Sequence, residues 1–183
     1  MGLIRSFMAL YRPFFVGFWT DPDIEPFKPL EKLIYSFLFT NDRTTESGIY
    51  TISKKHISER TGVSISETAE IMKNLESVYK KITRDGISIF VHGFLRRNSR
   101  GNPDMVDILI LKDLDNTPSL LCWKKFIEVY KNHRICNKIK EKIKSLSSVG
   151  DTSIGIEIGI EIDKRGSGGE KKRNSFKMPE VAL

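Results

Sequence analysis

The residue types that most often carry catalysis or bind metals are sparse in this sequence. It contains three histidines and two cysteines, and it has no phosphate-binding glycine loop and no HExxH segment. Cys122, His133 and Cys136 could supply three zinc ligands, but their spacing fits no standard zinc pattern. We therefore expect no enzyme activity, no catalytic residues, no metal and no cofactor, and we expect core cysteines and a surface histidine instead.

Basic side chains offer a second kind of chemistry, which is contact with phosphate groups. The formal net charge is +7, and it is spread unevenly along the chain. Residues 121–150 carry 8 Lys or Arg and 2 Asp or Glu, whereas residues 1–120 carry 16 and 15. A concentrated positive segment favours contact with a polyanion, although a solvated helix face would give the same composition.

The first of the helices that would position these cations is predicted to begin at Pro29. Proline has no backbone N–H, but the N–H at the first position of a helix has no partner within the helix in any case. A short β-prone run, residues 48–52, follows. Ser53 is suited to cap a helix that runs to about Arg60, and Gly62 is suited to end it in the left-handed conformation. Ser64 and Glu67 then predict a capping box at the start of the next helix.

A β-hairpin is predicted immediately after this pair of helices. Residues 81–84 and 87–91 are β-prone, and they flank Asp85-Gly86, a strong signal for a two-residue hairpin turn. Such a turn would pair Ile82 with Ile89. The order helix, strand, helix, tight turn, helix and hairpin is that of a winged helix-turn-helix domain.

We therefore expect a mainly α fold with a small β-hairpin. The expected organisation is an N-terminal arm at residues 1–26, a winged helix-turn-helix domain at 27–118, a basic helical extension at 119–148 and a low-complexity, flexible tail at 149–183. In the tail, five isoleucines alternate with Gly, Glu and Asp and are followed by a Gly-Ser-Gly-Gly linker. Without an evident partner strand, such a segment is not expected to be stable as a strand.

The basic extension carries two apolar stripes, and its register changes near Asn132-His133, which predicts a bend or two helices. The first stripe contains Trp123, and we expect it to pack back on the preceding domain. The second stripe, which includes Ile135 and Ile139, is bordered by lysines. We expect the second stripe to pair with a partner chain or to lie along a polyanion.

DNA contacts are expected from the second helix of the pair, which enters the major groove in this architecture, and from cations around it. The predicted DNA-contact residues are Lys54, Lys55, Ser64, Ser66, Lys73, Lys80, Lys81, Arg84, Arg96, Arg97 and Arg100. Glu67 and Glu70 lie on the same helix and oppose a phosphate surface.

Four segments resemble the phage replisome organiser proteins, whose N-terminal winged helix is similar to that of the DnaD primosome proteins. They are "FWTDPDIEPF", "EKLIYSFLFTND", "SGIYTIS" and "FLRRNSRGNP", in the order and near the spacing found in that family, and they lie within residues 14–118. The resemblance implies a DNA-binding protein of phage or prophage DNA replication. Its implied partners are DNA and the replicative helicase or its loader, and its winged helix can also self-associate into a homo-oligomer.

Two other functions remain open from the residues alone. A transcription regulator could use the same winged helix on an operator, and a winged helix can also serve as a self-assembly or protein-interaction module. A cytoplasmic location is expected, because two cysteines do not make a disulfide scaffold and the apolar runs are too short to span a membrane.

Overall fold

The computed structural model describes residues 14–98, 101–117 and 119–149, with side chains up to residue 145. All of these residues belong to one compact unit. The predicted tail lies outside the described residues from residue 150 onward, as do residues 1–13 of the predicted N-terminal arm.

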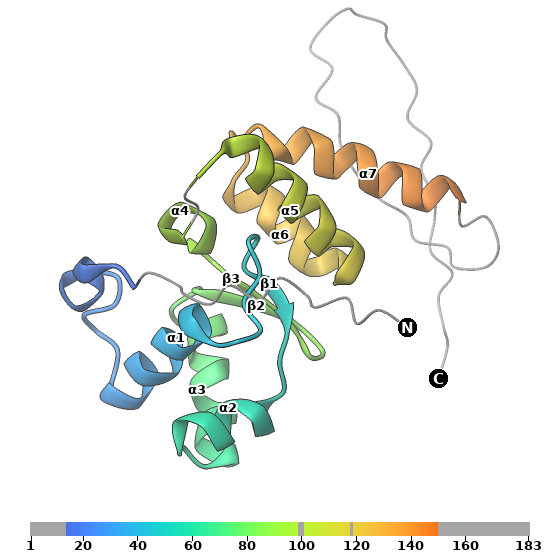
Figure 1. Cartoon of the computed structure of the whole chain (residues 1–183). Coiled ribbons are helices and arrows are strands. Elements are labelled where there is room, and N and C mark those ends of the chain that lie inside the picture. Colours follow the sequence, from blue (N-terminus) through green and yellow to red (C-terminus); the bar gives the residue numbers. More distant parts are fainter. Residues whose placement is uncertain (1–13, 99–100, 118, 150–183) are drawn as a thin grey trace, which may run out of the picture. The chain divides into compact units, whose positions relative to one another are not determined.

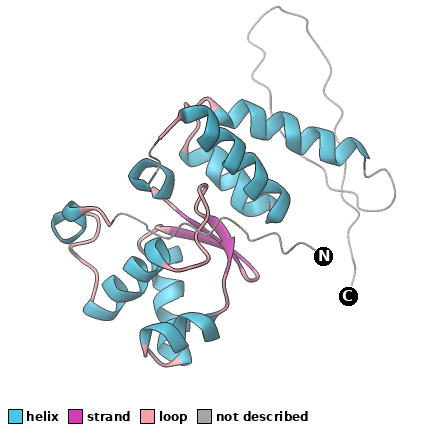
Figure 2. Ribbon diagram, in the orientation of Figure 1, coloured by secondary structure: helices cyan, strands magenta, loops and turns pink. Residues whose placement is uncertain are grey.

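The described part of the chain is mainly helical, with one small antiparallel sheet, as predicted (Figure 2). In chain order the elements are η1 (Val16–Thr20), α1 (Pro29–Thr40), β1 (Ile49–Thr51), α2 (Lys54–Thr61), α3 (Ile65–Ser77), β2 (Ile82–Asp85), β3 (Ser88–Val91), α4 (Phe94–Asn98), α5 (Pro103–Asn116), α6 (Leu120–Val129) and α7 (Ile135–Val149). The expected order of helices and strands is therefore confirmed through β3. Helix α4, which directly follows the hairpin, was not predicted.

The sheet has the strand order β1-β3-β2 and lies between two groups of helices (Figure 1). Alternate residues of a strand point to opposite faces, so β3 contributes to both sides. Ile89 and Val91 join a core with α1, α2 and α3, whereas Phe90 joins a second core with α5, α6 and α7. The helices after the hairpin thus cover the sheet face that α1–α3 leave open.

The first core also takes in part of the predicted N-terminal arm. Phe18, in η1, and Ile24 are completely buried there, and the ring of Phe18 stacks on that of Tyr35 in α1. Fully burying side chains of this size contributes about 1.5–3 kcal/mol each. The segment that precedes α1 is therefore held against the helices from residue 18 onward.

The second core confirms one expectation about the basic extension and corrects another. Trp123 of α6 is fully buried against the sheet and donates its indole N–H to the Thr117 carbonyl oxygen at 2.8 Å, so the first stripe packs back as expected. The extension forms two separate helices, α6 and α7, and not one continuous helix, also as expected. The prediction that the second stripe is left for a partner was wrong, because Ile135 and Ile139 are fully buried in the same core beside α5.

The hairpin forms with a register different from the predicted one. Ile82 pairs with Val91 instead of Ile89, and the two turn residues are Gly86 and Ile87 instead of Asp85 and Gly86. Gly86 alone in this turn has a positive φ, of 60°, which matches a type II′ turn with glycine first. The partner changes by two residues, so the same side chains still face the first core.

Two glycines are required by the backbone around the helix pair. Gly62 has a φ of 74° and ends α2, as predicted, while its amide donates to the Ser58 carbonyl oxygen. Gly48 precedes β1 with a φ of 75°, and a Cβ added there would lie 2.5 Å from the Cβ of Phe94. A Cβ added at Gly62 would meet no neighbouring atom, so only the left-handed backbone conformation disfavours other residue types at this position.

The Gly62→Ala variant is expected to lose about 1 kcal/mol of unfolding free energy, the cost of the left-handed conformation for a residue with a Cβ. Gly62→Asn should lose less, because asparagine tolerates this conformation better. Urea unfolding of the three proteins measures both differences. If Gly62→Ala left the free energy of unfolding unchanged or raised it, residue 62 would not have the left-handed conformation described here.

Candidate nucleic-acid interface

The two helices of the predicted DNA-binding pair are each fixed at the start by a serine. The Ser53 hydroxyl oxygen accepts the His56 amide N–H at 3.1 Å, and the Ser64 hydroxyl oxygen accepts that of Glu67 at 3.3 Å. The Ser64 hydroxyl also donates to the Glu67 carboxylate, so the serine half of the predicted capping box forms and Glu67 bonds the Ser64 side chain. Ser64 is therefore engaged in capping α3, while Ser66 beside it is exposed.

Three of the predicted contact lysines are exposed on the helix pair. Lys54 and Lys55 lie in the first turn of α2, and Lys73 lies on the outer side of α3. Lys55 is 3.8 Å from Glu59, a solvent-exposed pair one turn apart that is worth little. Within the described residues, no carboxylate lies at ion-pair distance from Lys54 or Lys73. All three ammonium groups are therefore accessible to an anion.

Lys54 also borders a hollow between the helix pair and the hairpin. The hollow has a volume of about 170 Å³. Its lining comes from four elements, α2, α3, β2 and β3, and from their connections: Ile52, Ser53, Lys54, Ile57, Met72, Arg84, Gly86, Ile87, Ser88 and Ile89. The start of α2 and the tip of the hairpin thus lie side by side, and a phosphate backbone that touches one can reach the other.

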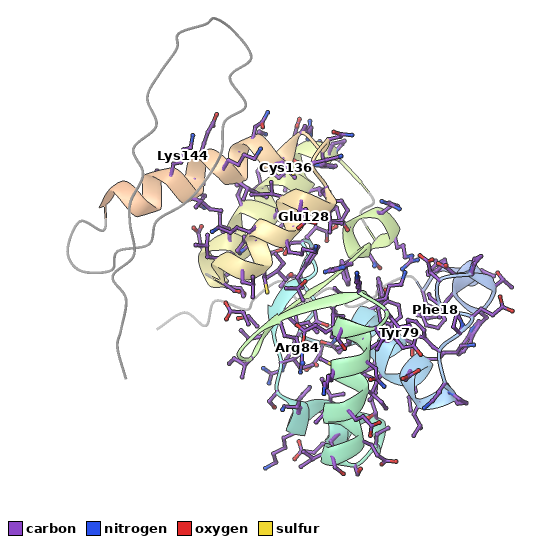
Figure 3. All side chains as sticks on the ribbon, turned by 180° about the vertical axis from the view of Figure 1, so that it is seen from behind. Phe18, Tyr79, Arg84, Glu128, Cys136 and Lys144 are labelled. Atoms are coloured by element: carbon purple, nitrogen blue, oxygen red, sulfur yellow. The ribbon has the colours of Figure 1, made fainter. Side chains whose placement is uncertain are left out.

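The cations of the hairpin already have carboxylate partners. Arg84 is labelled in Figure 3. Its Nε and one of its terminal nitrogens donate to Glu76 Oε2, at 2.9 and 2.6 Å, and its backbone N–H donates to Glu76 Oε1. Lys81 Nζ lies 2.7 Å from Asp23 Oδ2. This hydrogen bond and the lysine charge lower the pKa of Asp23. Both cations are thus neutralised within the chain.

Arg97 is held in the same way at the far end of α4. Its guanidinium donates to Asp21 and lies over the rings of Phe15 and Phe39, 4.6 and 5.7 Å from their centres. Such contacts hold the Arg97 side chain of α4 against α1 and the segment before it. Arg96 and Lys80 are exposed, and Lys80 has the single non-glycine positive φ in the described chain, 51°. Arg100 lies outside the described residues.

Part of the charge of the basic extension is balanced by α5. Lys138 and Arg134 approach the buried carboxylate of Asp107 at 3.0 and 3.2 Å, and Lys142 lies 2.7 Å from Asp115. Removing one partner of Asp107 would leave an incompletely compensated buried charge. The excess of cations at 121–150 thus reflects a basic helix beside an acidic one, and three of its cations are committed to that contact.

Residues suited to catalysis or metal binding do not come together in the described chain. Cys122 and Cys136 are both buried, and burial raises the pKa of each thiol. No group of three or more His, Cys, Asp and Glu side chains that could hold a metal ion occurs among the residues described. None of the helices described is long and apolar enough to cross a lipid bilayer.

The carboxylates that pair with the predicted DNA-contact cations were missed from the sequence. Glu76 and Arg84 are eight residues apart, Asp23 and Lys81 fifty-eight, and Asp21 and Arg97 seventy-six. The short separation could have suggested the first pair, because Glu76 lies in the last turn of α3 and Arg84 lies in the next strand. The other two pairs depend on the segment before α1 packing beside the start of β2 and beside α4, for which the sequence contains no local signal.

The predicted contact cations in the described chain therefore fall into two sets. Lys81, Arg84 and Arg97 are paired with carboxylates, whereas the exposed set is Lys54, Lys55, Lys73, Lys80 and Arg96. Comparison of the chain with protein-family models, with curated proteins and with solved structures found no match.

Proposed function

We propose that residues 29–91 form a winged helix-turn-helix domain and that the protein binds duplex DNA during phage or prophage replication. The observation that carries the proposal is the juxtaposition of α2, α3 and the β2–β3 hairpin, with Lys54, Lys55 and Lys73 exposed on the helix pair. The resemblance of residues 14–118 to phage replisome organisers supports the replication role.

The charges on α3 favour contact with the DNA backbone over reading of bases. Glu67 and Glu70 lie in its first half, and they would repel the phosphates that border the major groove. Lys73 lies one turn further along, and Lys54 and Lys55 lie at the start of α2. A duplex held mainly by these lysines would be bound with little sequence preference, which suits a replication protein better than an operator-binding regulator.

The hairpin cations contribute less in this proposal than the sequence suggested. A phosphate that binds Arg84 must replace its two-point contact with Glu76, and one that binds Lys81 must replace Asp23. Either exchange contributes little to the free energy of DNA binding, because the cation gains a phosphate partner and loses a carboxylate partner. Among the residues that the structure describes, Lys54 and Lys73 have no carboxylate competitor, and Lys55 has only its loose pair with Glu59.

The salt dependence of duplex binding tests which lysines touch phosphate. Each phosphate contact contributes about 0.9 to the slope of log K against log salt concentration, so the triple variant K54Q/K55Q/K73Q should have a slope shallower by about 2 to 3. Fluorescence anisotropy with a labelled duplex, repeated with an unrelated sequence, measures the slope and the sequence preference. The matched control is K124Q/K131Q/K140Q, which removes the same charge from exposed positions of the extension.

An unchanged slope in the first triple variant, together with a shallower slope in the control, would move the DNA contact to the extension and overturn the assignment. A strong preference for one duplex sequence would favour the regulator over the replication protein.

A further inference from the structure

A groove beside α3 has no role in the proposed DNA contact. It has a volume of about 350 Å³ and lies between the start of α1 and the side of α3. The residues that line it are Lys28, Pro29, Leu30, Glu31, Glu67, Glu70, Ile71 and Asn74. The groove is thus apolar along part of its floor and acidic along the α3 side.

The apolar part extends onto the outer surface of α1. Leu30 is 42% exposed, and Leu33, one turn further along, is 40% exposed. Residues three apart on a helix are neighbours, so the two leucines form a continuous apolar strip at the mouth of the groove. An amphipathic helix that binds in a groove inserts apolar side chains spaced in the same way.

The carboxylates that line the groove differ in how firmly they are held. Glu31 is 2% exposed and accepts hydrogen bonds from the Lys28 backbone N–H, from Asn74 Nδ2 and from the Tyr79 hydroxyl. Burial alone would raise the pKa of Glu31, but these hydrogen bonds outweigh it, and the pKa lies below its ordinary value. Glu67 is held by the α3 cap, and Glu70 is exposed with no partner among the described residues. The groove thus has two exposed carboxylates on its α3 side, those of Glu67 and Glu70, whereas the carboxylate of Glu31 is buried and already hydrogen-bonded.

We propose that this groove docks a basic amphipathic segment of a protein partner, with an apolar side chain over Leu30 and Ile71 and with lysine or arginine beside Glu67 and Glu70. Charge complementarity selects this occupant, because the same carboxylates repel nucleic acid and acidic peptides. The proposal does not depend on DNA binding, since none of Lys54, Lys55 and Lys73 lines the groove.

Two synthetic helical peptides of equal length test the docking surface. Both carry leucines at positions i, i+3, i+4 and i+7, and they differ only in having lysine or glutamate at every flanking position. Anisotropy of the labelled peptides is measured against the full chain and against E67Q/E70Q, which retains a residue suited to the α3 capping box. The matched control is E59Q/E141Q, which removes two exposed carboxylates elsewhere.

The lysine peptide is expected to bind the full chain and the control equally, and to bind E67Q/E70Q about tenfold more weakly, as loss of two exposed charge pairs implies. Leu30→Ser should weaken it as well, with thermal unfolding used to confirm that each variant is folded. Equal binding of both peptides, equal loss in both double variants, or no binding of the lysine peptide would overturn the proposal. A change of oligomeric state in E67Q/E70Q without peptide binding would assign the groove to a second copy instead.

Discussion

Replacing Trp123 with alanine is expected to lower the free energy of unfolding by about 3–5 kcal/mol, the range for removal of a large aromatic side chain from a core. Trp123 is fully buried, contacts the ring of Phe126 and donates its indole N–H to Thr117. Its loss would leave a cavity beneath the sheet and would remove one of the two hydrogen bonds that the Thr117 carbonyl oxygen accepts, the other coming from the Ser119 backbone N–H. Urea unfolding followed by circular dichroism measures the change.

The matched control is Leu121→Ala in the same helix. Leu121 is 51% exposed, so its truncation should change the free energy of unfolding by no more than about 0.5 kcal/mol. If Trp123→Ala cost as little as Leu121→Ala, α6 would not be part of the core. The expected result also implies that a fragment ending at residue 118 exposes Phe90, which α6 covers.

A second large effect is expected from pH, through Asp113 of α5. Its carboxylate accepts the Ser47 backbone N–H at 2.9 Å and is buried beside the loop that precedes β1. Burial raises the pKa of Asp113 to about 6, even though hydrogen bonds from Ser47 and Thr45 act in the opposite direction. The folded protein therefore binds a proton at Asp113 more tightly than the unfolded chain does.

The sign of the effect follows from this difference. The contribution of Asp113 to stability is fully present below the ordinary aspartate pKa of 3.8 and is lost as pH rises through about 6. Lowering the pH from about 7.5 to about 5 should therefore stabilise the protein by about 1 kcal/mol through this group. His92 acts oppositely in the same window, because burial lowers its pKa and protonation then favours the unfolded chain.

Asp113→Asn separates the two contributions, since the variant keeps His92 and an oxygen that can accept the Ser47 amide. The wild-type protein should gain about 1 kcal/mol relative to the variant between the higher and the lower pH. Urea unfolding of both proteins at the two pH values measures this difference. A constant difference would show that Asp113 titrates normally in the folded protein.

The helix pair could be predicted because its signals are local. Ser53, Gly62 and Ser64 each act on residues within one turn, and the structure places all three at the expected helix ends. The hairpin turn was predicted one residue too early in the chain, because Asp85-Gly86 and Gly86-Ile87 are both acceptable two-residue turns. Pairing across the sheet decided between them.

The role of α7 could not be predicted in the same way. A narrow apolar stripe among lysines fits a docking helix as well as a core helix, and only the acidic α5 beside it distinguishes the two. Lys138 and Asp107 are 31 residues apart, so their contact appears only in the folded chain. The same holds for Lys81 with Asp23, which changes an expected phosphate contact into an internal ion pair.

Hydrogen exchange of the full chain, with and without duplex DNA at low salt, tests the proposal that α2, α3 and the hairpin turn contact DNA. We expect slower exchange of backbone amides at the start of α2, in α3 and at the β2–β3 turn, with α6 and α7 unchanged. Protection confined to α6 and α7, or no protection at DNA concentrations that saturate binding in the anisotropy titration, would contradict it.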